Sequence, residues 1–216
     1  MTVAGMRKIL NSTLIADGRS DRVLIPIIAT LLQTHSPQQF RETDFVQEFP
    51  SSGLNLSERI DFALRERPCD LLFVHRDAER ADGLTSRVRE IERAVAALGI
   101  LQTVVCVVPV RMTEAWLICD EHPIRCAAGN PTGRSPLGLP ELNQVESVDA
   151  KELLFDALVR AKNLGRRRAN GLNPASMRSH VADYLDDMDR LRRLPSFRRF
   201  ESSVRQILSN APFVDA

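Results

Sequence analysis

Residues 71–80 read LLFVHRDAER, and this stretch decides the fold that the sequence predicts. Its first four residues are apolar without interruption, which is typical of a strand buried on both faces of a parallel sheet. Five of the next six residues can carry or share a charge. The abrupt change predicts that a cluster of charged side chains lies where a core strand leaves the sheet.

The segments on either side of this stretch alternate between strand and helix patterns. We predict strands at residues 7–16, 43–49, 69–77 and 101–110. We predict helices after Ser20, at 55–67 with Ser57 as its N-cap, and at 84–99, closed by Gly99. Pro26 strains the first turns of the helix after Ser20, so we expect that helix to start later.

This order of elements predicts an α/β fold with a Rossmann-like, mostly parallel sheet and helices on both faces. Residues 1–148 are expected to form this α/β domain, with a loop rich in glycine and proline at about residues 120–148. Helical patterns then follow at residues 149–164, 176–190 and 196–209. They predict a helical C-terminal subdomain, residues 149–216, packed on the α/β domain.

Composition limits the classes of protein to consider. The chain has 216 residues, 44% of them hydrophobic, which is enough for one sizeable core. A net charge of +1 gives no overall attraction to nucleic acid or to an acidic membrane. The four cysteines form no CxxC pair, and no apolar run has membrane-spanning length. We therefore expect a cytoplasmic protein with reduced thiols and no membrane segment, of undetermined oligomeric state.

Carboxylates follow three of the predicted strands: Asp17 the first, Asp77 and Glu79 the third, and Glu114 the fourth. Parallel strands bring their carboxyl ends to one edge of the sheet, where ligands of such folds bind. Carboxylates brought together repel unless a cation neutralises them. Mg²⁺, which prefers oxygen ligands and keeps several waters, is the cation that this pattern predicts.

The charged residues around Asp77 have two readings. If the strand geometry continues, Asp77 and Glu79 share a face and Ala78 leaves room for a ligand. Alternatively, the two carboxylates are solvated turn charges paired with Arg76 and Arg80. His75 reads most simply as a hydrogen-bond donor at the end of the strand.

Two sets of segments carry a resemblance to known families. LIADGRSDRVLIPII, followed by LLFVHRDAE, resembles the Toprim fold of topoisomerases, primases and overcoming-lysogenization-defect-type nucleases. VPVRMTEAWLICD, IRCAAGNPTG, LPEL, DAKELLFDAL and LPSFRRF are similar to an uncharacterised bacterial Toprim-like family, known only as a domain of unknown function. The second resemblance runs through most of the chain, so it is the more specific of the two.

The resemblance implies roles for individual residues. Asp17 takes the place of the Toprim glutamate, a general acid/base or metal ligand, and Asp77 and Glu79 take the positions that hold Mg²⁺. Asp17 is one methylene shorter than that glutamate, and Glu79 is one methylene longer than the aspartate it replaces. Arg76 or Arg111 would neutralise phosphate charge, as guanidinium geometry allows.

The function that follows is metal-dependent binding or cleavage of nucleic-acid phosphodiesters with Mg²⁺ or Mn²⁺, and the resemblance suggests DNA repair or phage defence. The alternatives are a non-catalytic interaction module, whose partner is a protein encoded nearby, and an enzyme acting on a small phosphorylated molecule. The basic run Arg166, Arg167 and Arg168 is a candidate contact for DNA or RNA. The same run also reads as a solvated helical surface.

Overall fold

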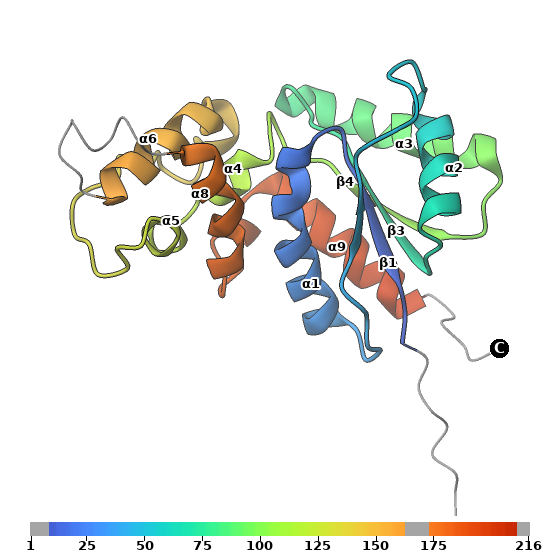
Figure 1. The fold of residues 1–216 in the computed structure, drawn as a ribbon, viewed down its shortest axis with the longest axis horizontal. Coiled ribbons are helices and arrows are strands. Elements are labelled where there is room, and N and C mark those ends of the chain that lie inside the picture. Colours follow the sequence, from blue (N-terminus) through green and yellow to red (C-terminus); the bar gives the residue numbers. More distant parts are fainter. Residues whose placement is uncertain (1–8, 163–172, 211–216) are drawn as a thin grey trace, which may run out of the picture.

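The centre of the molecule is a parallel sheet of four strands. The computed structural model of the protein describes residues 9–162 and 173–210. Within these ranges the strands are β1 (Ser12–Ile15), β2 (Asp44–Val46), β3 (Leu71–His75) and β4 (Thr103–Val107). They lie in the order β2-β1-β3-β4, and every neighbouring pair is parallel (Figure 1). The predicted α/β fold with a parallel sheet is confirmed.

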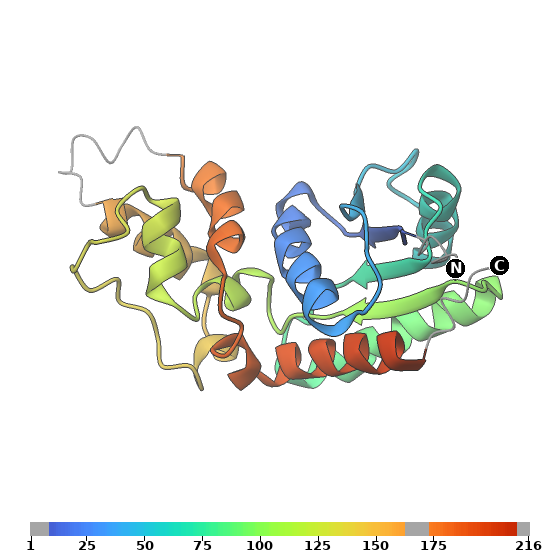
Figure 2. The same ribbon diagram turned by 90° about the horizontal axis from the view of Figure 1, so that it is seen from below.

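Helices cover both faces of this sheet. On one face lie α1 (Leu24–His35) and α9 (Pro195–Asn210), and on the other lie α2 (Leu56–Glu66) and α3 (Leu84–Leu98) (Figures 1 and 2). In β3, Leu71 and Phe73 enter the core beneath α1 and α9, whereas Leu72 and Val74 enter the core beneath α2 and α3. Successive side chains of a strand point to opposite faces, so β3 supplies both cores at once.

The first helix begins later than its apolar pattern suggests. After β1 the chain makes a 3-10 turn over Arg19–Val23, and α1 starts at Leu24. Pro26 therefore occupies the third position of α1, where a backbone N–H has no carbonyl partner inside the helix. The ring costs no hydrogen bond there, and the late start expected from Pro26 is confirmed.

The helices on the other face have well-defined ends. The side chain of Asn55 accepts a hydrogen bond from the Glu58 N–H at 3.0 Å, and the Glu58 carboxylate accepts one from the Asn55 N–H at 2.7 Å. This reciprocal cap makes Asn55 the N-cap of α2. The prediction of Ser57 was wrong, because Ser57 lies inside the helix and donates to the Ala94 carbonyl of α3. Gly99 ends α3 in the left-handed region, with φ 58°, as predicted.

Short helices form a lobe beside the sheet (Figure 1, left). They are α4 (Glu114–Leu117), α5 (Glu121–Ala127), α6 (Ala150–Lys162) and α8 (Pro174–Val181). Further 3-10 turns lie at Ala81–Gly83, Val145–Ser147, Ala182–Tyr184 and Leu191–Arg193. The helix α5 falls in the segment 120–148, which was expected to be a loop. None of the helices in residues 9–162 and 173–210 combines the length and the apolar character needed to cross a bilayer.

Elements on either side of residue 148, the predicted domain boundary, contact each other. The division into two domains stays a prediction. On the lobe side, α5 packs against α6 and α8. After the lobe the chain returns to the sheet, where α9 lies along β4 and contacts α1 (Figure 2). The last helix is therefore part of the sheet layer, whereas α6 and α8 belong to the lobe.

An aromatic cluster joins the lobe, the last helix and the sheet. The ring of Trp116 in α4 stacks on Phe200 at 5.5 Å between centroids and meets the edge of Phe197 at 5.2 Å. Phe200 also meets Phe73 of β3, with 6.3 Å between ring centroids. The indole N–H of Trp116 donates to the hydroxyl of Ser196 at 2.9 Å, so its one polar atom is satisfied inside the core.

We predict that Phe200→Ala lowers the free energy of unfolding by about 3–5 kcal/mol, because it removes a buried ring shared by three elements. Urea unfolding, followed by the fluorescence of the single tryptophan, measures this loss. Leu101→Ala is the control, since Leu101 is 98% exposed and its loss should change stability by less than about 0.5 kcal/mol. Equal stabilities for the two variants would show that α9 is not anchored in the core.

Candidate functional site

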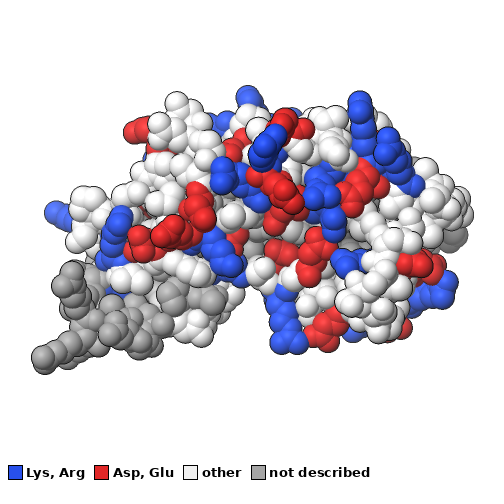
Figure 3. All heavy atoms as spheres, turned by 90° about the horizontal axis from the view of Figure 1, so that it is seen from above, with Lys and Arg blue, Asp and Glu red and all other residues white. Residues whose placement is uncertain are grey.

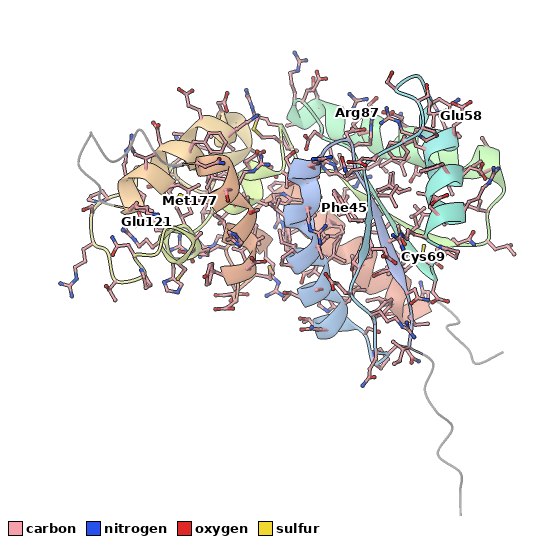
Figure 4. All side chains as sticks on the ribbon, viewed as in Figure 1. Phe45, Glu58, Cys69, Arg87, Glu121 and Met177 are labelled. Atoms are coloured by element: carbon pink, nitrogen blue, oxygen red, sulfur yellow. The ribbon has the colours of Figure 1, made fainter. Side chains whose placement is uncertain are left out.

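The carboxyl ends of β1 and β3 lie side by side, and the loops that follow them separate. The loop after β1 leads to α1 on one face of the sheet, and the loop after β3 leads to α3 on the other. Open α/β sheets bind ligands at the carboxyl edge, where the loops of neighbouring strands diverge in this way. In Figure 4, Glu58 and Arg87 lie at this edge and Cys69 at the opposite end of β3.

Asp17, the first residue predicted for the site, lies at this edge and is paired with two arginines. Its carboxylate accepts a hydrogen bond from Arg59 at 2.8 Å, and both of its oxygens lie 3.0 Å from Nη1 of Arg76. The other terminal nitrogen of Arg76 lies 3.1 Å from a carboxylate oxygen of Glu90 in α3. Arg76 therefore bridges the end of β1 to the helix that follows β3.

His75 is the buried centre of the site. Its side chain is 1% exposed, and Nε2 lies 3.2 Å from Oδ1 of Asp77 and 3.3 Å from the hydroxyl of Thr113. On the other side of the ring, Nδ1 lies 3.5 Å from Oδ2 of Asp21, beyond good hydrogen-bonding distance. The imidazole thus sits between two carboxylates that belong to the loops after β1 and β3.

The electrostatic environment favours the protonated imidazole. Burial disfavours the imidazolium, but the hydrogen bond to Asp77 and the charges of Asp77, Asp21 and Asp17 outweigh it, so the pKa of His75 is raised. Burial also raises the pKa of Asp21, with a further contribution from the charge of Asp77, although His75 acts in the opposite direction. The pKa of His75 and the pKa of Asp21 thus depend on each other and on the charge of Asp77.

Sequence reasoning missed Asp21. Its carboxylate accepts a hydrogen bond from the Gly18 N–H at 3.1 Å, and this bond holds the loop after β1. Gly18 is extended there, with φ −148°, and the 3-10 turn starts at the next residue. The signal available in the sequence was the spacing Asp17-Gly18-x-x-Asp21, which puts a second acid on the same short loop. Nothing in the sequence pointed to Arg59, which comes from α2.

Ala78 and Glu79 continue β3 in the direction of solvent. Ala78 is buried and makes an isolated parallel bridge with Val110, which extends the pairing of β3 and β4 beyond both strands. The side chain of Glu79 is 85% exposed and lies 3.6 Å from Arg87 of α3. The Glu79 carboxylate is therefore open to solvent, whereas Asp77 is held by His75.

The residues predicted after β4 point away from the acidic groups. Arg111 adopts φ 66°, an uncommon value for a residue other than glycine, and its guanidinium donates to the Ser147 carbonyl at 3.0 Å. Glu114, expected to complete the acidic cluster, is 6% exposed and forms an ion pair with Arg178 of α8. Glu114 therefore joins two helices of the lobe, α4 and α8. Arg166, Arg167 and Arg168 lie outside the described residues.

The groups open to a ligand at this edge are carboxylates that lie next to basic side chains. The side chains of Asp17 and Asp77 are 44% and 39% exposed. Within residues 9–162 and 173–210, no cluster of three or more His, Cys, Asp and Glu side chains has the geometry of a metal site. The surface over this edge mixes acidic and basic side chains (Figure 3), so it offers local recognition without a field of one sign.

None of the models of known protein families matches this chain, and neither do any of the curated proteins or solved structures compared with it. The functional argument therefore depends on the arrangement of the side chains at the carboxyl edge of the sheet.

We predict that His75 makes stability depend on pH. A raised pKa stabilises the fold below the ordinary imidazole value of 6.5, and this contribution is lost as the pH rises through the pKa of the folded protein. The free energy of unfolding of the wild type should therefore fall above pH 6.5, and His75→Gln should remove that fall. At lower pH the variant should be less stable by about 1–3 kcal/mol, because a buried hydrogen bond is lost.

Urea unfolding at a series of pH values checks this prediction. His122→Gln is the matched control, because His122 is exposed and lies in the lobe, and it should keep the wild-type profile. A His75→Gln profile parallel to that of the wild type would contradict the prediction.

Proposed function

We propose that the carboxyl edge of the sheet binds a divalent cation, Mg²⁺ or Mn²⁺, together with a nucleic-acid phosphodiester, as in a Toprim-like nuclease. The observation that carries the proposal is the position of Asp17 and Asp77. They end neighbouring strands at the point where the following loops diverge, and the guanidinium of Arg76 lies on Asp17. The acidic oxygens suit the metal ion, and the arginine donor at the same edge suits the phosphate that the ion would bind.

The donor set suits Mg²⁺ as proteins commonly hold it. This ion is usually bound through one or two carboxylates, with water and substrate phosphate completing its shell. Asp77 has one oxygen near His75 and a side chain 39% exposed, so its carboxylate is both oriented and accessible. Asp17 and the exposed Glu79 are the further candidates, whereas Glu114 does not fit because Arg178 holds it. A bound ion of this kind polarises a phosphoryl oxygen and acidifies a bound water.

The arginines give the site its affinity for phosphate. Arg59 and Arg76 share the oxygens of Asp17. A cation on Asp17 competes with both guanidiniums for these oxygens, so their N–H donors become available to a phosphate. Guanidinium geometry suits a phosphate, and Arg76 stays positioned because Glu90 holds its other nitrogen.

A second candidate function is supported by the same ion pairs. Two guanidiniums, those of Arg59 and Arg76, compensate the charge of Asp17. With Asp17 paired in this way, the chain is also suited to a non-catalytic role, in which the fold serves to bind a protein or a nucleic acid. An enzyme acting on a small phosphorylated molecule would use the same groups.

Titration with Mn²⁺ and Mg²⁺ tests the cation. At about ten times its dissociation constant, a bound ion stabilises the folded state by about 1.4 kcal/mol, which raises the midpoint of thermal unfolding by roughly 3–6 °C. We expect Asp77→Asn to abolish this rise and Glu79→Gln to reduce it less, because Glu79 is 85% exposed. Asp82→Asn is the control, since Asp82 is a nearby exposed carboxylate paired with Arg80. A rise that Asp77→Asn leaves unchanged would place the ion elsewhere.

Incubation with single- and double-stranded DNA and RNA, in the presence of Mn²⁺, separates the functions. A nuclease should lose about 100-fold or more of its cleavage rate in Asp77→Asn, because the neutral amide removes the charge that would hold the metal ion. Binding without cleavage would favour the non-catalytic role. Cleavage that continues unchanged in Asp77→Asn would rule out this edge as the nuclease site.

A further inference from the structure

The outer edge of the sheet at β4 carries a groove that is separate from the acidic site. The groove has a volume of about 510 Å³, and its floor is formed by Val104, Val105, Cys106 and Val108. One wall comes from α3 and the other from α9, which lies along β4 in Figure 2. Asp17, His75 and Asp77 are not among the residues that line it.

The backbone of β4 is open toward this groove. Val107 pairs with His75, and its carbonyl accepts a hydrogen bond from the Arg76 N–H at 3.1 Å. Alternate residues of a parallel strand direct their N–H and C=O groups to the same side, so Thr103, Val105 and Val107 face β3. The peptide groups of Val104, Cys106 and Val108 therefore face outward, where no strand in the described part of the chain pairs with them.

Each wall combines apolar side chains with one charged residue, which lies beside the middle of β4. The wall from α3 has Val88, Ile91 and Val95 with Glu92, and the wall from α9 has Phe200 and Ile207 with Arg199. Burial and, to a lesser extent, the charge of Glu92 raise the pKa of the Cys106 thiol to about 11, while Arg199 acts in the opposite direction. The two charges therefore act on the same point of β4 from opposite walls.

Neither charge is used within the described part of the chain. Glu92 and Arg199 are both exposed, and neither side chain forms an ion pair there. They stay apart because β4 and the groove separate their helices. A strand lying in the groove would direct successive side chains to the two walls, since the side chains of a strand alternate.

We propose that β4 accepts an extended segment of a partner protein as a fifth strand, a segment that is apolar except for one basic and one acidic residue next to each other. The basic residue would face Glu92 and the acidic residue Arg199, while apolar neighbours cover the half-buried Val95 and Ile207. Main-chain hydrogen bonds to Val104, Cys106 and Val108 supply affinity, and the two walls supply specificity.

A second copy of this chain fits the groove less well. Antiparallel pairing of two β4 strands about a two-fold axis would place α3 beside α3 and α9 beside α9. Because β4 is short, the axis would pass near Cys106, and Glu92 would meet Glu92 while Arg199 met Arg199. Like charges opposed across a strand pair are destabilising, so the charges favour a heterologous segment.

The test uses the full chain and three blocked peptides of one framework, Ac-VTVLKDVLT-NH2, Ac-VTVLKKVLT-NH2 and Ac-VTVLDDVLT-NH2, each carrying a fluorophore for anisotropy. The wild type should bind the mixed-charge peptide about three- to tenfold more tightly than each like-charge peptide. In a like-charge peptide, one of the two charged residues is repelled by Glu92 or Arg199 where the mixed-charge peptide is attracted. This design does not depend on which wall a given side chain faces, since either placement of the mixed pair can be reached by a shift of one residue.

Two charge reversals should then change the order of preference. Arg199→Glu makes both walls acidic and should favour the peptide with two lysines, whereas Glu92→Lys makes both walls basic and should favour the peptide with two aspartates. Arg205→Glu, on the same helix but outside the groove, is the matched control and should keep the wild-type order. All three positions are exposed, so the variants should fold.

Amide hydrogen exchange gives a second readout at single residues. Binding should slow exchange at Val104, Cys106 and Val108 and leave Val105 and Val107 unchanged, because the latter two already bond to β3. Failure of all three peptides to bind, an order of preference that the reversals do not change, or unprotected amides at these residues would each overturn the proposal. So would a dimer in light scattering whose formation protects the same amides without peptide.

Discussion

Burial of β3 on both faces is the constraint on which the rest of the structure depends. All five of its residues are buried, so every peptide group of the strand needs a partner inside the sheet. β1 and β4 supply those partners from either side, and helices must cover both faces to exclude water from the alternating apolar side chains. The end of such a strand is the first place where the chain can present charge, and His75 is the residue at that end.

The same constraint explains the electrostatics of the candidate site. A buried imidazole and a buried carboxylate are costly unless they compensate each other, and His75 lies between Asp21 and Asp77 at the ends of two strands. Farther out, guanidiniums from α2 and from the loop after β3 compensate Asp17. What remains open to a ligand is the exposed part of Asp17 and Asp77. The proposed ligand, a phosphodiester with a divalent cation, would meet these carboxylates.

The prediction of elements from the sequence succeeded where apolar spacing alone sets the structure. The strand at residues 71–75 and the helix closed by Gly99 follow directly from an uninterrupted apolar run and from a residue that tolerates positive φ. It failed where two local signals competed: Asn55 and Ser57 both suit an N-cap, and only the reciprocal bond with Glu58 favours Asn55. The helix α5 was missed because the surrounding glycines and prolines are typical of a loop.

The sequence by itself determined which side chains end the core strands, since burial of apolar residues fixes where β1 and β3 can stop. The pattern of apolar runs therefore suffices to place Asp17, His75 and Asp77 at one edge of the sheet. Only the tertiary structure decided which charges meet there. Arg59 of α2 pairs with Asp17, and Glu114 pairs with Arg178 of α8. Ion pairs between residues distant in sequence depend on how helices pack, and helix packing follows the shape of the whole core, which no local pattern of residues encodes.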